Sequence, residues 1–175
     1  SPTGELVQSA EEYTLVATVT DAVWNVGRGQ TTIPIDILVI RDGDRLRINT
    51  TAIQFAPNTA DYQNRVGREQ AERNRRTLDR LAEVLKKYPR YQIAIEGHAV
   101  QIYWNVPSRM QEEQDEVLLP LSESRAEVIE RALVERGIDG ARMTTRGYGG
   151  AVPVVPHGDL ENRWKNRRVE FILVR

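Results

Sequence analysis

The sequence predicts an α/β (α+β) fold, a two-layer sandwich with helices on a mixed sheet, plus an N-terminal β-strand appendage. From residue 45 onward, runs rich in β-branched and aromatic residues alternate with amphipathic helical patterns in the order β-α-β-α-β-(α)-β. Such alternation is typical of helices packed on a sheet. The chain has 175 residues, of which 40% are hydrophobic and 28% charged. This is enough for one domain, or one domain and a fragment, with its own core.

Three strands are expected before the first helix. Tyr13–Thr20 is dominated by β-branched and aromatic side chains and has no helical period. Residues 21–29 hold Asp, Asn and two Gly, which indicates a loop, and Ile33–Ile40 is the second strand. A tight turn at residues 41–44 leads into Arg45–Phe55, which begins by alternating basic and hydrophobic residues and is the third strand.

The clearest helix is predicted over Gly67–Tyr88. Six residues recur at a spacing of three to four and define its inner face: Ala71, Asn74, Leu78, Leu81, Ala82 and Leu85. Pro89 is expected to end the helix, because the residue before a proline avoids the helical conformation. Tyr91–Glu96 then follows as a strand, with its hydrophobic residues on one side.

A second long helix is predicted in the other half of the chain. Residues 101–116 are polar and contain a proline, so we expect a loop there. Ser122 is then the expected N-cap of the helix, and Gly137 its C-terminal cap. The remaining elements are expected to be a short strand at Met143–Tyr148, a short helix at Asp159–Arg167 and a final strand at Val169–Val174.

The composition excludes several kinds of site. The chain has no Cys, which excludes disulfides, a thiol nucleophile and a Cys-ligated metal. Its two His argue against a multi-His metal centre, and its net charge of −1 argues against a nucleic-acid partner. No apolar run approaches the ~20 residues that span a bilayer. No nucleophile–base constellation stands out, so we expect no enzyme, no cofactor and no metal.

Several blocks of sequence occur in a fixed order: IQFAPNTA at 53–60, the helical pattern at 74–85 with KYP at 87–89, IEGHA at 95–99, LSESRA at 121–126, GI at 137–138, GYG at 147–149 and NRRVE at 166–170. Together these blocks resemble the OmpA-like (OmpA/MotB/Pal) C-terminal domain. The resemblance implies a periplasmic domain that holds peptidoglycan non-covalently by clasping the diamino acid of the stem peptide. It also implies a place in the cell envelope, association with the outer membrane through N-terminal parts outside this chain, and envelope proteins as further partners.

The N-terminal segment resembles the closing strands of a bacterial Ig-like or FlgD-like β-sandwich, in residues 4–7, 13–19, 21 and 25. Such a sandwich needs about seven strands, and only two precede residue 41. We therefore expect a truncated sandwich segment at 1–44 and the OmpA-like domain at 45–175. The N-terminal strands would either be appended to the main sheet or pair with another chain. Because the first residue is Ser1 and not Met, we also expect a processed or excised piece of a longer protein.

The resemblance implies a binding site made of Arg125, His98, Ala99, Asn58, Leu121 and Arg168. A diamino acid head group carries an ammonium and a carboxylate on one carbon, so its pocket needs an acid and a guanidinium on opposite walls. Arg125 fits the guanidinium. With Ser122 as N-cap it would take the third helical position, where the helix dipole disfavours a cation but helps to bind a carboxylate. The alternative is a surface ion pair between Arg125 and a neighbouring Glu.

The site departs from the family pattern at two positions. Val100 stands where the family has its Asp, and Leu118 where it usually has Asn. The segment from Val100 to Leu121 is also longer than usual by about ten residues, a change that loops absorb cheaply. Three outcomes stay open: an acid of the insertion replaces the Asp, the pocket takes a different ligand, or binding is lost. The candidate acids are Glu112, Glu113, Asp115 and Glu116, and a solvated acidic loop is the alternative.

Two further features leave alternatives. For His98 we expect a structural hydrogen bond, since a metal ligand would need partners that the sequence does not place nearby. Arg167 and Arg168 either bind peptide or glycan charges at the pocket mouth, or cap a helix end and form surface salt bridges. The functional hypotheses are a peptidoglycan anchor and, alternatively, a divergent OmpA-like module that binds another protein or another cell-wall ligand.

Overall fold

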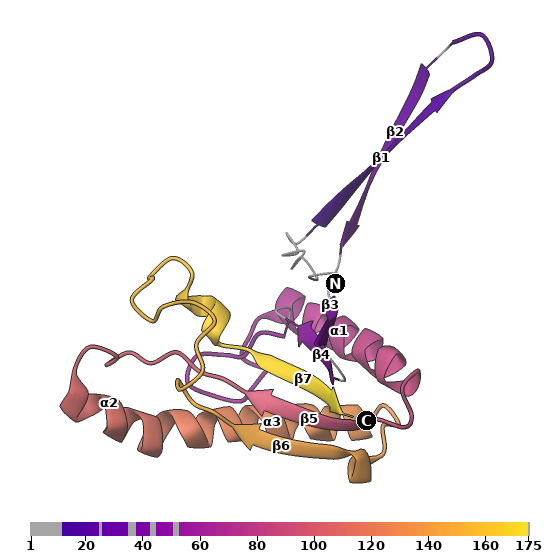
Figure 1. The fold of residues 1–175 in the computed structure, drawn as a ribbon. Helices are drawn as coiled ribbons and strands as arrows, with labels where there is room; N and C mark the ends of the chain where they lie inside the picture. Colours follow the sequence, from indigo (N-terminus) through magenta and orange to yellow (C-terminus); the bar gives the residue numbers. More distant parts are fainter. Residues whose placement is uncertain (1–11, 25, 35–37, 43–44, 51–52, 175) are drawn as a thin grey trace.

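The computed structural model describes residues 12–24, 26–34, 38–42, 45–50 and 53–174. It contains a five-stranded sheet in the order β3-β4-β7-β5-β6 and a two-stranded sheet of β1 and β2 (Figure 1). The strands are β1 (Glu12–Thr20), β2 (Val26–Pro34), β3 (Leu38–Asp42), β4 (Arg45–Thr50), β5 (Gln92–Gly97), β6 (Met143–Gly147) and β7 (Val169–Val174). The helical elements are α1 (Arg68–Lys86), α2 (Pro107–Glu113), the π-helix η1 (Gln114–Leu118), α3 (Leu119–Val134) and the 3₁₀ turns η2 (Gly140–Arg142) and η3 (Arg163–Asn166).

The predicted mixed sheet with helices packed on it is confirmed. β7 lies antiparallel between β4 and β5, while β5 and β6 run parallel and are joined through α3. Helices α1 and α3 lie behind the sheet in the view of Figure 1. The core between the layers includes Leu78 and Leu81 from α1, Ile129 and Leu133 from α3, and Ile95 with its cross-strand partner Phe171 from the sheet.

Helix α1 follows the predicted pattern closely. Its inner face is buried over the expected positions except Ala71, which is half-buried, and Pro89 follows its end. Asn74 is fully buried and accepts a hydrogen bond from the Gln54 N–H (3.0 Å). It donates through Nδ2 to the carbonyls of Gln54 (2.8 Å) and Tyr62 (2.7 Å). This polar core residue therefore fixes the 53–62 segment against α1.

The region predicted as a loop over residues 101–116 is helical from Pro107 onward. α2, η1 and α3 follow one another without a gap from residue 107 to residue 134. Pro107 takes the first helical turn, where its missing N–H is not needed. Pro120 stands inside the run. The wider π turn precedes it directly, with the Leu119 N–H donating to the Gln114 carbonyl. A widened turn relieves the clash that a proline ring otherwise makes with the preceding turn.

The prediction of Ser122 as an N-cap is also wrong. Ser122 lies inside α3, where its hydroxyl donates to the Leu119 carbonyl (2.9 Å) and accepts the Gly149 N–H (2.8 Å). Arg125 therefore sits in a helix interior. The positive end of a helix dipole is not beside it, because the helical run begins at Pro107, far upstream.

The N-terminal strands begin and end at residues other than those predicted. β2 starts at Val26, inside the expected loop, and Asp21 turns the chain by accepting hydrogen bonds from Val23 and Trp24. The expected strand at 33–40 is divided between β2 and β3, and its residues 35–37 lie outside the described part. Full pairing of β1 with β2 explains the shift, since cross-strand contacts override the low strand propensity of the Gly-containing stretch. β4 ends at Thr50 rather than Phe55, and the last predicted helix is the short η3.

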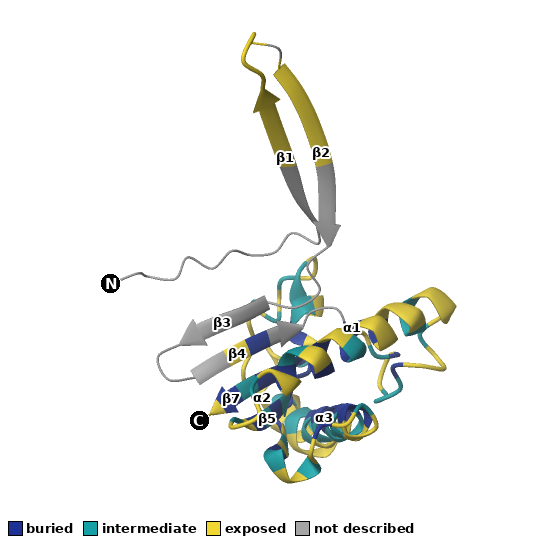
Figure 2. Cartoon of the chain, turned by 90° about the vertical axis from the view of Figure 1, so that its right-hand side faces the viewer, coloured by how far each residue is buried: buried dark blue, intermediate teal, exposed yellow. Residues whose placement is uncertain are grey.

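The β1–β2 hairpin projects away from the five-stranded sheet in both views (Figures 1 and 2). Residues 16–24 and 26–30 are exposed, including Val19 at 68% and Trp24 at 85%. β3, by contrast, pairs with β4 at the edge of the main sheet. Within the described residues, no helix is long and apolar enough to cross a membrane.

Candidate functional site

Arg125 is the central charged side chain of the candidate site. It projects from α3 and is only 3% exposed. Its Nε donates to the Thr59 carbonyl at 3.1 Å, and the guanidinium carbon lies 5.0 Å from the centre of the Phe55 ring. A carbonyl and an aromatic face, both attractive to a cation, thus hold the guanidinium against the 53–62 segment. No ion pair with a neighbouring Glu joins Arg125 in the part of the chain that the structure describes.

The electrostatic surroundings of Arg125 are unfavourable to its charge. The pKa of its guanidinium is lowered to about 10, mainly by burial and to a smaller extent by the nearby positive charge of Arg167. The group is still protonated at neutral pH. A buried cation without a carboxylate partner is costly, so Arg125 is well placed to gain from an anion that enters the site.

The loop against which Arg125 rests is held by its own hydrogen bonds. The Ala56 N–H donates to the Asp61 carbonyl (2.7 Å), and the Asp61 N–H donates to the Thr59 hydroxyl (3.0 Å). Asn58 adopts a left-handed conformation with φ 54°, a region in which Asn is tolerated better than most residues. It is exposed at the tip of this turn. The loop therefore offers a fixed carbonyl to Arg125.

The turn after β5 packs directly on α3. Its backbone is anchored on both sides, since the His98 N–H donates to the Arg168 carbonyl (2.9 Å) and the Ala99 N–H to the Gly149 carbonyl (2.7 Å). Ala99, Val100 and Leu118 are buried, Val100 and Leu118 at 9% and 5% exposure. The two departures from the family pattern are therefore aliphatic side chains in the interior, and neither can pair an ammonium group.

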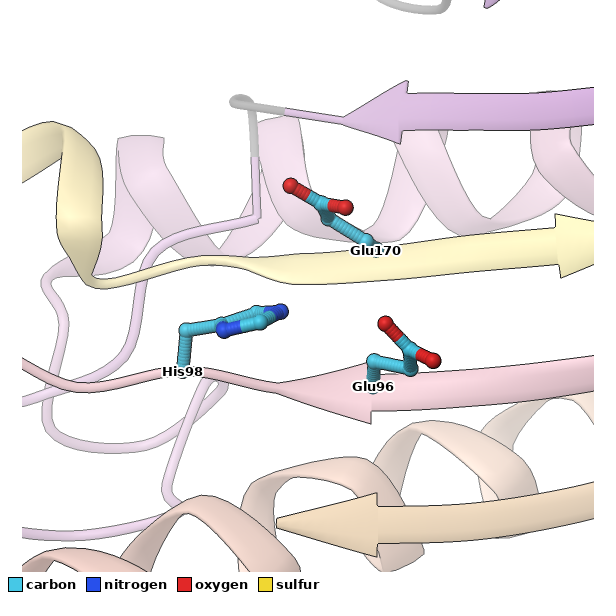
Figure 3. Close-up of side chains that lie close together, drawn as sticks. All are labelled: Glu96, His98 and Glu170. Carbon is cyan, nitrogen blue, oxygen red and sulfur yellow. The ribbon is translucent and has the colours of Figure 1, made fainter. Parts of the chain in front are cut away.

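His98 is part of a second buried polar cluster (Figure 3). Its ring extends toward Glu96 of β5 and Glu170 of β7, and it stacks on Tyr148 at 5.4 Å with planes 8° apart. The expected structural hydrogen bond from the ring is absent within the described residues, where both ring nitrogens are buried and unpaired. Burial, with a smaller effect from Arg168, lowers the pKa of His98 to about 4, so the ring is neutral at pH 7.

Glu96, His98 and Glu170 each offer a ligand atom, and these atoms lie within 4.8 Å of one another. Three such ligands could in geometry hold a cation. However, Arg168 Nε lies 2.6 Å from one Glu170 oxygen and Arg47 Nε lies 3.6 Å from the other. Both oxygens of Glu170 already face guanidinium groups, so a divalent ion would have to compete with two fixed positive charges.

The two arginines before β7 have different environments. Arg168 is 4% exposed and paired with Glu170, and its NH2 also donates to the Val152 carbonyl (3.2 Å). Arg167 is exposed, and its positive charge contributes to the lowered pKa of Arg125. The sequence analysis considered both arginines at the pocket mouth but included only Arg168 in the expected site.

The inserted segment contributes structural polar residues that the sequence reasoning did not identify. The Gln114 side chain donates to the Tyr148 carbonyl (2.9 Å) and accepts from the Gly150 N–H (2.8 Å). The Gln101 side chain donates to the Met110 carbonyl (2.9 Å). Glu113 accepts the N–H groups of Ile102 and Tyr103. The insertion is therefore a helix fastened to the site turns.

An open hollow of about 450 Å³ lies beside the later turns of α3, and its lining does not include Arg125. It is lined by Ala60, Asp61, Tyr62, Gln63, Asn64, Val128, Arg131, Ala132 and Glu135. The pKa of Asp61 is lowered mainly by hydrogen bonds from the backbone of Asn64 and Gln63, which hold this carboxylate within its own loop. Leu121, one turn before Arg125 on α3, is half-buried.

The fold and site define an α+β module with a buried arginine, set between a fixed loop and a helix, that has no acidic partner among the residues the structure describes. A family model described as "OmpA family" matches residues 68–167. The chain belongs to the OmpA family.

Curated relatives match the same part of the chain. The peptidoglycan-associated lipoprotein of Rhizobium meliloti (strain 1021) is 39% identical over 97 residues, covering 55% of this chain and 49% of the relative. The peptidoglycan-binding protein ArfA of Mycobacterium tuberculosis (strain ATCC 25618 / H37Rv) is 33% identical over 96 residues, covering 55% and 26%. The chain thus spans half or less of the length of these relatives.

Solved structures share the fold. The periplasmic domain of Helicobacter pylori MotB (residues 90–256) is 18% identical with a TM-score of 0.62, covering 79% of this chain and 78% of that one. The cell wall anchor of the T6SS from Pseudomonas aeruginosa is 24% identical with a TM-score of 0.59, covering 79% and 87%. None of these comparisons supports the Ig-like resemblance of the N-terminal segment.

Proposed function

We propose that this chain binds peptidoglycan non-covalently through the stem peptide and so anchors an envelope protein to the cell wall. The observation that carries the proposal is Arg125, a buried guanidinium without a described carboxylate partner. Two relatives named for peptidoglycan association or binding support it. Stem peptides carry carboxylates, and a guanidinium–carboxylate pair is among the stronger hydrogen-bonded contacts that proteins make.

The chemistry of the site is binding without catalysis. Arg125 is held by Thr59 and Phe55 before any ligand arrives, so little side-chain entropy is lost on binding. The relatives carry names of lipoproteins, binding proteins, a porin and a motility protein. We place the chain in the periplasm or cell envelope, associated with the outer membrane through segments outside it, with peptidoglycan as the main partner and envelope proteins as further partners.

The division into an N-terminal segment at 1–44 and an OmpA-like domain at 45–175 remains part of the proposal. The exposed β1–β2 hairpin supports an origin in a larger β-structure, because an isolated two-stranded hairpin is at best marginally stable in water. A truncated Ig-like sandwich would supply the missing strands. Because β3 pairs with β4 in the main sheet, the proposed sandwich origin concerns only the β1–β2 hairpin.

A second candidate function is a divergent OmpA-like module that binds another protein or another cell-wall ligand. The buried aliphatic side chains of Val100 and Leu118, and the helix built from the insertion, favour it. This alternative keeps the scaffold but gives up capture of the diamino acid.

Cosedimentation with purified sacculi tests the proposal. The wild-type chain should pellet, and Arg125→Ala should weaken binding by about tenfold to a hundredfold, the usual effect of losing a charge-assisted contact. Arg73→Ala is the control, since Arg73 is a helical arginine with 55% of its side chain exposed, faces Glu69 and lies outside the candidate site. If neither the wild type nor the control pellets, the second candidate function is favoured.

A further inference from the structure

The strongest unexplained feature of the molecule is the one-sided charge of the Arg125 site. Arg125 is only 3% exposed, and the charged group that shifts its pKa is another cation, Arg167. A site for a zwitterion needs an acid opposite the guanidinium. The pKa of Arg125 is lowered mainly by burial, and the one charge that adds to this effect is the cation of Arg167.

The acids beside Arg125 in the chain and in the loop that holds it are already used elsewhere, and Glu127 lies 3.9 Å from Arg131. Glu123, two residues before Arg125, accepts the Gly147 N–H at 3.1 Å. Asp61, in the loop that holds Arg125, accepts the N–H groups of Gln63 and Asn64 at 2.9 and 2.8 Å. Neither carboxylate is paired with Arg125 in the described structure.

The insertion does not supply a substitute acid among the contacts of the described residues. Glu113 caps the turn at Ile102 and Tyr103, and Asp115 accepts from the Gln111 side chain at 2.7 Å. Glu112 and Glu116 are exposed on the helix surface. The turn position that could face a ligand ammonium carries Val100, which is buried and apolar.

Taking the proposed peptidoglycan site as our starting point, we infer that it recognises a carboxylate alone and does not require an ammonium group on the ligand. Arg125 makes the buried contact and the exposed Arg167 adds a second positive charge. Two sources in a stem peptide carry this chemistry, the carboxylate of the diamino acid and the C-terminal carboxylate of the peptide. The preference follows because no acid of the described residues pairs with either cation, so an ammonium group brought beside them would be repelled.

Four soluble probes separate these possibilities, with binding followed by the Nε–H and backbone amide signals in NMR. They are diaminopimelate, its di-N-acetyl derivative, N-acetyl-D-alanyl-D-alanine and the C-terminal amide of that dipeptide. We expect the di-N-acetyl derivative to bind within about threefold of diaminopimelate and the amide not to bind, since only the carboxylate is recognised. Comparison of the di-N-acetyl derivative with the free dipeptide then identifies the source of the carboxylate.

Variants test the assignment to the two arginines. Arg125→Lys keeps the charge but loses the planar fork, so carboxylate binding should fall by about tenfold. Arg167→Gln changes an exposed residue and should weaken binding by about two- to fivefold, less than the loss of a buried contact. Arg73→Gln, which changes an exposed arginine of α1 that faces Glu69, should leave binding unchanged. Circular dichroism and thermal unfolding of each variant show that the fold is intact.

The outcomes distinguish this inference from the proposed function. If diaminopimelate binds at least about tenfold more tightly than its di-N-acetyl derivative, or if the dipeptide amide binds as well as the free acid, the inference is wrong. Sacculi with acetylated amines should pellet the chain as well as untreated sacculi do. If untreated sacculi pellet it and acetylated ones do not, the inference fails while the proposed function stands. If the soluble carboxylates bind in the expected pattern but sacculi do not pellet the chain, the proposed function fails while the preference for a carboxylate stands.

Discussion

Gly97 at the end of β5 lies in direct contact with the backbone of Ser122 in α3. A Cβ placed on Gly97 would be 2.0 Å from the Ser122 carbonyl oxygen and 2.8 Å from its carbonyl carbon. Gly147 at the end of β6 meets the same helix, with a Cβ position 2.6 Å from the Glu123 nitrogen. The two glycines let the strands end against α3, close to Arg125. Backbone atoms cannot move aside as a side chain can, so the contact sets the position of the helix.

We expect Gly97→Ala to destabilise the protein by about 1–3 kcal/mol, the usual cost of overpacking, or more if α3 must shift. Urea unfolding measures the change. Gly29→Ala is the control, because nothing lies within 4 Å of its Cβ position. Equal effects of the two substitutions would show that the contact with Ser122 is not tight.

Asn74→Ala should lower stability by about 1–3 kcal/mol, because it removes the hydrogen-bond partner of the buried Tyr62 carbonyl and of the partly buried backbone groups of Gln54. It should also weaken sacculus binding, since those bonds hold the loop on which Arg125 rests. Denaturant unfolding and cosedimentation measure the two effects. Asn64→Ala, an exposed change in the same loop, should alter neither. A variant that loses stability but keeps full binding would show that the loop position is not needed.

The burial of His98 predicts a pH dependence of stability. Its pKa is lowered to about 4 from an ordinary value of 6.5, so between these values the unfolded chain binds more protons than the folded one. Stability should therefore fall as the pH drops from about 6.5 toward 4, by on the order of 2–3 kcal/mol. In His98→Gln this part of the pH profile should flatten. His157→Gln controls for the other histidine of the chain; an unchanged slope in His98→Gln would assign the effect elsewhere.

Helices and strands that follow from local hydrophobic periodicity were predicted from the sequence. The helix that depends on contacts with distant residues was not. The inner face of α1 and the strand β5, predicted at 91–96 and found at 92–97, follow from hydrophobic spacing. The helix at 107–118 has no strong apolar face and contains polar residues, so its spacing resembled a loop. Its anchors, such as Gln114 on Tyr148 and Gly150, come from residues more than thirty positions away.

The same distinction holds at the site. The burial of Arg125 was consistent with the expected role, but its environment was predicted from an N-cap that does not form. Proline and serine, the residue types at positions 120 and 122, are common at helix starts. Only the preceding π turn and the Gly149 contact of Ser122 explain their place inside a helix. No single-sequence signal distinguishes these two situations.

The β1–β2 hairpin should be the least protected part of the main-chain hydrogen bonding. It makes its ladder within itself, and the residues described at 16–24 and 26–30 are exposed. Amide exchange followed by mass spectrometry should show faster exchange over residues 12–34 than over β5 and β7, which pair with each other in the core sheet. Uniform protection across both regions would contradict the view that the hairpin is a fragment that lacks its partner strands.

Val100→Asp should change the ligand preference of the site. An acid on the turn after β5 would supply the negative charge that the site lacks, so diaminopimelate should then bind at least about tenfold more tightly than its di-N-acetyl derivative. Because Val100 is 9% exposed, the new charge is partly desolvated, and we expect a stability loss of about 1–3 kcal/mol without ligand. Val100→Asn has nearly the same shape without the charge and should keep the wild-type preference. If Val100→Asp folds but does not discriminate between the two probes, this turn does not face the ligand ammonium. The missing acid would then have to be sought on another wall of the site.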